Sequence, residues 1–139
     1  IGGYWDIDRF YDTYARQGDA HTCLLGDLSG ALTAFYRHVE KTGAAERVTV
    51  MVFSEFGRRV KENASLGTDH GCAAPMFLLS GKIKGGLHGP SPDLSNLDRG
   101  DLRFTIDFRR VYATLVEELF RIDSKKLLGG SFDKLGLFT

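Results

Sequence analysis

Val48-Thr49-Val50-Met51-Val52-Phe53 is the stretch of the chain that decides the fold. It is almost entirely apolar, it is rich in β-branched residues, and it has the length of a strand. Because apolar residues fall on both faces, the pattern predicts a central strand buried between two layers. Pro75-Met76-Phe77-Leu78-Leu79 is a second apolar run and predicts a second short strand.

Amphipathic helices are predicted on either side of these strands. From Asp19 to Thr42 apolar residues recur at steps of three and four, and Gly43 follows where a C-cap glycine is common. The apolar face of this helix consists of Leu24, Leu25, Leu28, Leu32, Phe35 and Val39. Thr105 is the expected N-cap of a second helix, with Asp107 in its first turn. Its apolar face consists of Phe108, Val111, Tyr112, Leu115, Val116, Leu119 and Phe120.

The segments between these elements are predicted to be loops. Ser54 to Cys72 carries several charges and shows no clear period, so it is expected to be a long connection, and Gly81 to Gly100 is expected to be mostly loop. The order helix, strand, loop, strand, helix predicts an α/β fold, a layered sheet with flanking helices. A single domain over residues 1–139 is expected at this length.

Composition narrows the classes of partner. The 139 residues include 18 basic and 18 acidic side chains, so neither a nucleic-acid partner nor an anionic membrane is predicted. No run approaches the roughly 18 apolar residues that a membrane span needs. Cys23 and Cys72 form no CxxC pair and are expected to be small buried residues, with a disulfide between them left open.

Asp69-His70, within Thr68-Asp69-His70-Gly71, is the first candidate for chemistry. A carboxylate binds hard cations and an imidazole suits zinc, so the pair is typical of half a divalent-metal site. The alternative is a turn in which Asp69 accepts backbone N–H bonds and His70 is exposed.

Ser54-Glu55-Phe56-Gly57-Arg58-Arg59 is the second candidate, because it directly follows the first predicted strand. Ligands gather at the carboxyl ends of strands in open α/β sheets. Glu55 is placed to be a metal ligand or general base, and Arg58 and Arg59 to grip a phosphate or sulfate. The alternative is an ordinary solvated strand end.

Asp12 belongs to a third candidate, the acidic stretch Trp5 to Tyr14, which either completes a metal shell or forms a solvated helix start. The sequence has no GxSxG elbow, no GxGxxG and no Walker loop. A serine hydrolase triad and dinucleotide or nucleoside-triphosphate binding are therefore not predicted.

Eight blocks of sequence occur in a familiar order along nearly the whole chain: Val48–Arg59, Gly67–Gly71, Ala74–Phe77, Lys84–Leu87, Asp101–Arg103, Asp107–Arg109, Val111–Leu115 and Leu127–Gly130. In these blocks the chain resembles the bacterial family known as domain of unknown function 1501. That family is similar to the alkaline phosphatase and sulfatase superfamily, whose α/β sandwich holds two divalent metals at the strand ends.

The resemblance implies the C-terminal part of longer, exported (periplasmic or extracellular) relatives, with the superfamily nucleophile outside this chain. Ser54-Glu55-Phe56-Gly57 resembles the superfamily's Ser-Asp-His-Gly, and Asp12-Thr13-Tyr14 resembles the family's Asp-Thr-His, each with an aromatic residue in place of histidine. The resemblance therefore implies a single divalent metal (zinc, manganese or calcium), with the ligands Asp12, Glu55, Asp69 and His70.

Three functions stay open on the sequence. The first is a metal-dependent hydrolase of phosphate or sulfate esters, with a small anionic substrate and the catalytic residues Glu55, Asp69, Arg58 and Arg59. The second is a metal-independent glycoside or carboxylic ester hydrolase that uses paired carboxylates. The third is a non-catalytic remnant of a larger hydrolase, which exposes an apolar face and forms a homo-oligomer.

Overall fold

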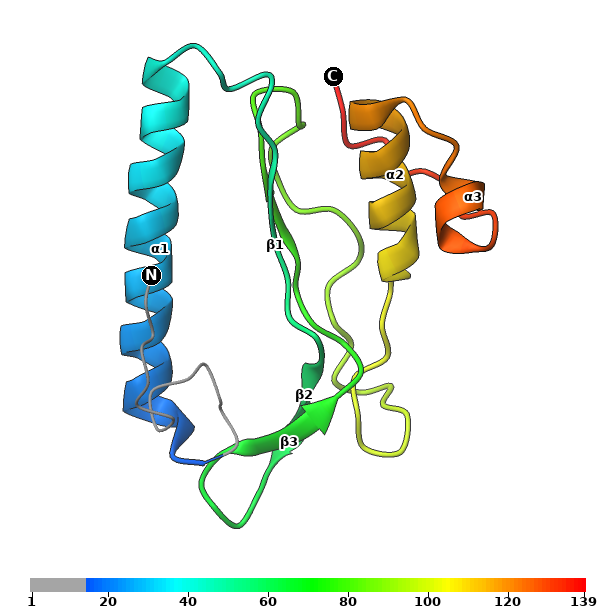
Figure 1. The fold of residues 1–139 in the computed structure, drawn as a ribbon. Coiled ribbons are helices and arrows are strands. Elements are labelled where there is room, and N and C mark those ends of the chain that lie inside the picture. The colour runs from blue at the N-terminus through cyan, green and yellow to red at the C-terminus, as the bar shows by residue number, and fades with distance from the viewer. Residues whose placement is uncertain (1–14) are drawn as a thin grey trace. The chain divides into compact units, whose positions relative to one another are not determined.

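The computed structural model describes residues 15–139, which form a mixed α/β fold of helices and short antiparallel strands (Figure 1). The elements in chain order are α1 (Gln17–Lys41), β1 (Val50–Val52), β2 (Gly57–Glu62), β3 (Thr68–Gly71), β4 (Phe77–Leu79), α2 (Phe108–Phe120) and α3 (Ser124–Leu128). They divide between two compact units. The first holds the described residues up to Gly81 together with Asp93–Arg103, and the second holds Lys82–Pro92 and Phe104–Thr139.

Helix α1 confirms the helix predicted from Asp19 to Thr42, with ends shifted by one or two residues. Its C-terminus is closed by Gly43, whose φ of +68° is one that glycine adopts without steric cost. At the other end the N-cap residue, Arg16, makes no side-chain capping bond, and the N–H groups of Arg16 and Gln17 donate to the carbonyl oxygens of Ser65 and Leu66. The start of α1 is thus tied to the turn between β2 and β3.

Strands β1 and β4 pair antiparallel, with Met51 opposite Leu78. Both strands lie within predicted strands, but the prediction of a strand buried on both faces is wrong. All three residues of β1 are only half-buried, and among the described residues its one partner strand is β4. A short apolar run indicates a strand without revealing how many neighbours cover it.

Strands β2 and β3 form an antiparallel hairpin where a long loop was predicted from Ser54 to Cys72. The sequence signal fails because four of the six β2 residues are charged and Val60 is its one large apolar residue, so no alternation of apolar residues marks the strand. Gly57 lies opposite Gly71, and a Cβ at Gly57 would lie 1.8 Å from the Ala73 carbonyl oxygen. The hairpin therefore requires glycine at this close approach of backbone to backbone.

Helix α2 begins two residues later than predicted. Asp107, not Thr105, is the N-cap, and its carboxylate accepts the N–H of Arg109 at 2.9 Å. Val111, Ala113 and Leu115 of α2 are buried together with Leu137. Thr114 is fully buried, and its Oγ1 donates to the Arg110 carbonyl at 2.7 Å and accepts the Leu135 N–H at 2.8 Å.

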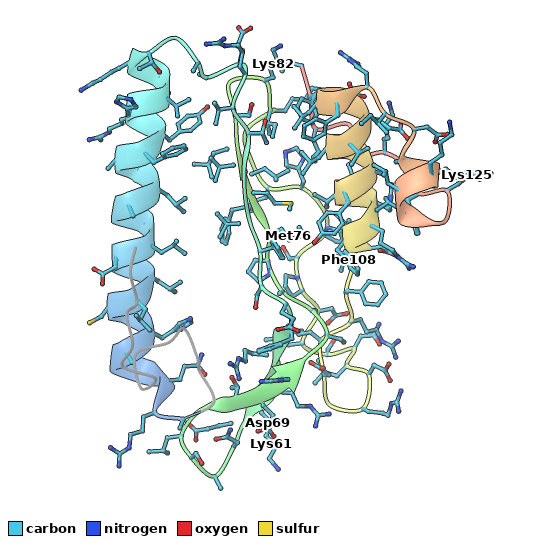
Figure 2. All side chains as sticks on the ribbon, viewed as in Figure 1. Lys61, Asp69, Met76, Lys82, Phe108 and Lys125 are labelled. Atoms are coloured by element: carbon cyan, nitrogen blue, oxygen red, sulfur yellow. The ribbon has the colours of Figure 1, made fainter. Side chains whose placement is uncertain are left out.

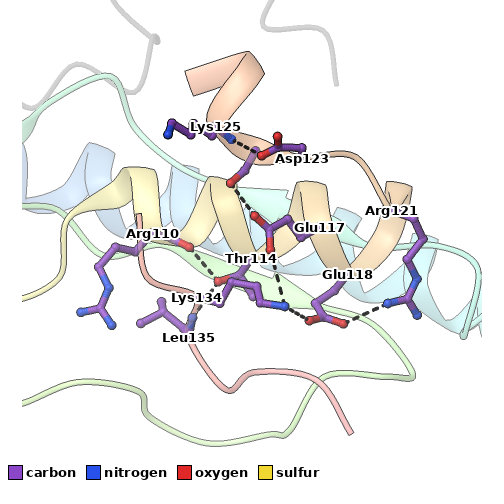
Figure 3. Close-up of polar contacts among 10 residues, drawn as sticks. Arg110, Thr114, Glu117, Glu118, Arg121, Asp123, Lys125, Lys134 and Leu135 are labelled. Atoms are coloured by element: carbon purple, nitrogen blue, oxygen red, sulfur yellow. Dashed lines mark hydrogen bonds and ion pairs between the residues drawn. The ribbon is translucent and has the colours of Figure 1, made fainter. Parts of the chain in front are cut away.

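Helix α3 was not predicted, and polar contacts join it and the C-terminal segment to α2 (Figure 3). Ser124 Oγ donates to Glu117 at 2.6 Å, and Lys134 Nζ lies 2.8 Å from Glu118 and 3.5 Å from Glu117. These bonds and charges lower the pKa of both glutamates and raise that of Lys134. Of the described helices, none is both long and apolar enough to cross a bilayer.

Candidate functional site

The β2–β3 hairpin carries four of the predicted site residues, and it divides them between its two faces. These residues are Arg58, Arg59, Asp69 and His70. Asp69 and His70 are consecutive residues of β3. Successive side chains of a strand point to opposite faces, so the two groups do not converge. Arg58 lies directly opposite His70 and shares its face.

The Asp69 face contains an open depression of about 450 Å³. Its lining consists of Arg59, Lys61, Glu62, Asn63, Ala64, Asp69, Arg99 and Gly100. Asn63 Nδ2 donates to Asp69 Oδ1 at 3.1 Å, which fixes the orientation of this carboxylate. Asp69 and Lys61, which both line the depression, are labelled on the hairpin in Figure 2.

Positive charge predominates in the depression. Three of its side chains, Arg59, Lys61 and Arg99, are cationic, and two, Glu62 and Asp69, are anionic. Within residues 15–139 neither Arg59 nor Lys61 is part of an ion pair. Arginine and lysine side chains that are not engaged in ion pairs can bind phosphate and sulfate oxygens.

Arg99 and Gly100 reach the depression from a tight turn. The N–H and C=O of Asp98 bond to the C=O and N–H of Asp101, at 2.8 and 2.9 Å. Arg99 and Gly100 between them have φ of 50° and 82°, the left-handed pair that a two-residue hairpin turn needs. An arginine in this conformation is uncommon, and such backbones cluster at binding sites.

Two contacts attach this turn to the hairpin. Arg59 donates from a guanidinium nitrogen to the Arg99 carbonyl at 3.1 Å. The Asp101 carboxylate accepts the Cys72 N–H at 3.0 Å and the Leu102 N–H at 2.8 Å. Gly71 leaves the room for this carboxylate, because a Cβ there would lie 2.8 Å from Asp101 Oδ1.

The His70 face is aromatic. The rings of His70 and Phe56 stack with centroids 3.6 Å apart at 15°, and the Arg58 guanidinium lies 5.2 Å from the Phe56 centroid. Arg58 also donates to the Thr68 carbonyl at 2.7 Å. Arg58 is therefore a part of the hairpin's own structure, whereas Arg59 faces the depression. Glu55 is exposed in the bend before β2 and does not line the depression.

The described residues do not by themselves assemble the predicted metal centre. Within residues 15–139 no three histidine, cysteine, aspartate or glutamate side chains come together to hold a metal ion. Asp69 and His70 are on opposite faces, and Asp12 lies outside the described residues. A metal held by Asp12, Glu55, Asp69 and His70 stays a prediction.

Sequence reasoning missed the residues that shape the depression, namely Lys61, Asn63, Arg99 and Gly100. One signal was available: Asn63-Ala64-Ser65-Leu66-Gly67 has turn residues at both ends, and the Asn63 side chain accepts the N–H groups of Ser65 and Gly67. Such a turn between charged segments indicates an exposed hairpin. The two cysteines were predicted to be buried, which is wrong, since both are exposed free thiols.

Comparison with known families gives a match over residues 2–132 to the family described as protein of unknown function (DUF1501). The chain belongs to this family. The match includes every residue that lines the depression, so these side chains lie inside the family's domain. Neither the curated proteins nor the solved structures contain a match to the chain.

Proposed function

We propose that this member of the DUF1501 family is a hydrolase of anionic esters, phosphate or sulfate, and that the depression on the Asp69 face of the hairpin holds the anionic group. The observation that carries the proposal is the set of three cationic side chains, Arg59, Lys61 and Arg99, gathered around one oriented carboxylate, Asp69.

Arg59 and Lys61 bind the oxygens of the ester group in this proposal. A guanidinium presents parallel N–H donors and an ammonium a compact charge, and both neutralise the charge that develops as the ester bond breaks. Asp69, held by Asn63 at 3.1 Å, accepts a proton from the water that attacks the phosphorus or sulfur atom. The bond to the ester oxygen breaks, and that oxygen leaves with the bonding electrons and takes a proton from solvent. Asp69 is preferred to Glu55 for this role because Glu55 does not line the depression.

The family resemblance implies a metal ion, and the proposal leaves to experiment whether turnover depends on it. Bound near the ester it would supply Lewis acidity. Because Asp69 and His70 do not converge, the steps assigned here to Arg59, Lys61 and Asp69 do not pass through it.

Turnover of aryl phosphates and aryl sulfates by the full chain, with and without a chelator, tests the proposal. Lys61→Ala should raise KM because it removes a binding charge, and Asp69→Asn should lower kcat. Lys126→Ala, an exposed lysine on α3, is the matched control and should leave both constants unchanged. Absence of turnover, or wild-type kinetics in both site variants, would contradict the assignment.

Exposed apolar side chains favour a second candidate, a chain that assembles with itself. Among the side chains of α1 whose burial the structure describes, only Val39 is buried, while Leu25 and Phe35 on the apolar face are 46% and 50% exposed. Uncovered apolar faces of this kind become interfaces. Light scattering of the full chain at rising concentration tests it, and a monomer throughout would remove this candidate. The remaining function left open by the sequence, a metal-independent glycoside or carboxylic ester hydrolase with paired carboxylates, has no specific contact within residues 15–139 that favours it.

A further inference from the structure

We propose that Asp101 is a positioning residue of the anion site: its carboxylate fastens the Asp98–Asp101 turn to the end of β3 and so holds Arg99 and Gly100 at the depression. This inference rests on the proposed function, because it assigns to the same depression a residue that touches no ligand.

The contacts of Asp101 show how the fastening works. One carboxylate oxygen accepts the N–H of Cys72, just past β3, and the other accepts the N–H of Leu102. Two backbone bonds between Asp98 and Asp101 close the turn itself. The carboxylate therefore links a closed turn to the end of a strand. Without that link, the turn would keep its own backbone bonds, but within residues 15–139 only the Arg59 bond to Arg99 and the weak thiol bond from Cys72 to the Leu102 carbonyl would still connect it to the hairpin.

Arg59 makes the second attachment, and it depends on the first. Its guanidinium donates to the Arg99 carbonyl at 3.1 Å, so the position of Arg99 also sets where the Arg59 charge lies. Displacement of the turn would move two of the three cations of the depression, Arg59 and Arg99, at once. The effect of Asp101 on anion binding is thus expected to exceed that of a single distant carboxylate.

The sign of the effect separates positioning from simple electrostatics. Asp101 is negative, and removal of a negative charge near a cationic site should by itself strengthen anion binding. Asp98 supplies the matched control, because it is an acid in the same turn whose carboxylate makes, within residues 15–139, only a loose, exposed ion pair with Arg99 at 3.7 Å. Asp98→Asn and Asp101→Asn change the net charge equally.

The experiment is an NMR titration of the full chain with inorganic sulfate, followed at the Gly100 amide. Asp98→Asn should bind sulfate as tightly as wild type or more tightly. Asp101→Asn should bind it about threefold to tenfold more weakly, the loss expected from one weakened hydrogen bond to a charged group. Asp101→Glu keeps the charge but is one methylene longer, so it should also weaken binding, and it replaces Asp101→Asn if that variant does not fold.

The outcomes distinguish the two proposals. If wild type binds sulfate and Asp101→Asn binds it as tightly as Asp98→Asn does, the positioning role is overturned while the anion site stands. If wild type binds neither sulfate nor aryl phosphate, the proposed function is overturned. Trypsin cleavage after Arg99 then tests the fastening directly: it should be faster in Asp101→Asn than in Asp98→Asn, and equal rates would overturn it.

Discussion

The carboxylate of Asp101 and the backbone of Cys72 are joined by a hydrogen bond of 3.0 Å, although the residues are 29 positions apart in the chain. The same contact acts on the Cys72 thiol. Neighbouring protein atoms partly desolvate the sulfur, and the Asp101 charge and its hydrogen bond add to this effect, so the pKa of Cys72 is raised above its ordinary value. The thiol also donates to the Leu102 carbonyl at 3.2 Å, which favours its protonated form.

Alkylation of Cys72 should therefore be slow near neutral pH and should accelerate only at alkaline pH. In a Cys23→Ser background, Asp101→Asn should lower the pKa of Cys72 and shift the rate profile toward neutral pH, because the thiolate loses a negative neighbour. The measurement is the iodoacetamide rate against pH. Superimposable profiles for the two proteins would show that Asp101 does not act on this thiol.

Thr114 bridges α2 and the C-terminal segment through one hydroxyl that both donates and accepts. Thr114→Val keeps the shape of the side chain but leaves the Leu135 N–H without its acceptor. The free energy of unfolding in urea should fall by about 1–3 kcal/mol. Thr114→Ser keeps the hydroxyl and serves as the control. Equal stability of the valine and serine variants would mean that the bond to Leu135 contributes nothing measurable.

Local sequence patterns predicted the helices better than the sheets. The spacing of apolar residues placed α1 within two residues at each end, because a helix face is set by neighbours three and four positions away. The start of α2 was misjudged because Thr105 and Asp107 are both good N-cap residues. Which of them caps the helix depends on the bond that the Arg109 N–H donates to the Asp107 carboxylate, which composition does not reveal.

The candidate site depended on contacts that no local pattern encodes. Arg59 and Asp69 were singled out from the sequence, and the structure places both at the depression. Arg99 was not, because the bonds that bring its turn to the hairpin, from Arg59 to Arg99 and from Cys72 to Asp101, span 40 and 29 positions. The adjacency of Asp69 and His70 suggested that both bind one metal ion. In a strand, however, consecutive side chains point to opposite faces, so adjacency separates these two.

Gly57 provides a test of the hairpin itself. Gly57→Ala would place a methyl group 1.8 Å from the Ala73 carbonyl oxygen, so backbone must move and stability should fall by about 1–3 kcal/mol. Gly26→Ala is the opposing control. Gly26 lies within α1 with open space around it, and alanine there should stabilise the helix by about 1 kcal/mol. Thermal unfolding midpoints that shift in the same direction for both variants would contradict the close approach at Gly57.

Asp107 makes the stability of α2 depend on pH in the acidic range. Hydrogen bonds from the Arg109 side chain and N–H lower the pKa of Asp107 to about 2, below the roughly 3.9 of an unfolded aspartate. A depressed pKa means that the charged cap stabilises the fold above about pH 4 and that this contribution is lost as pH falls toward 2. Asp107→Asn should thus lower the unfolding midpoint at pH 7 and lose this difference near pH 2. Arg109→Gln should raise the pKa of Asp107 in an NMR titration, and an unchanged value would show that Arg109 is not its main cause.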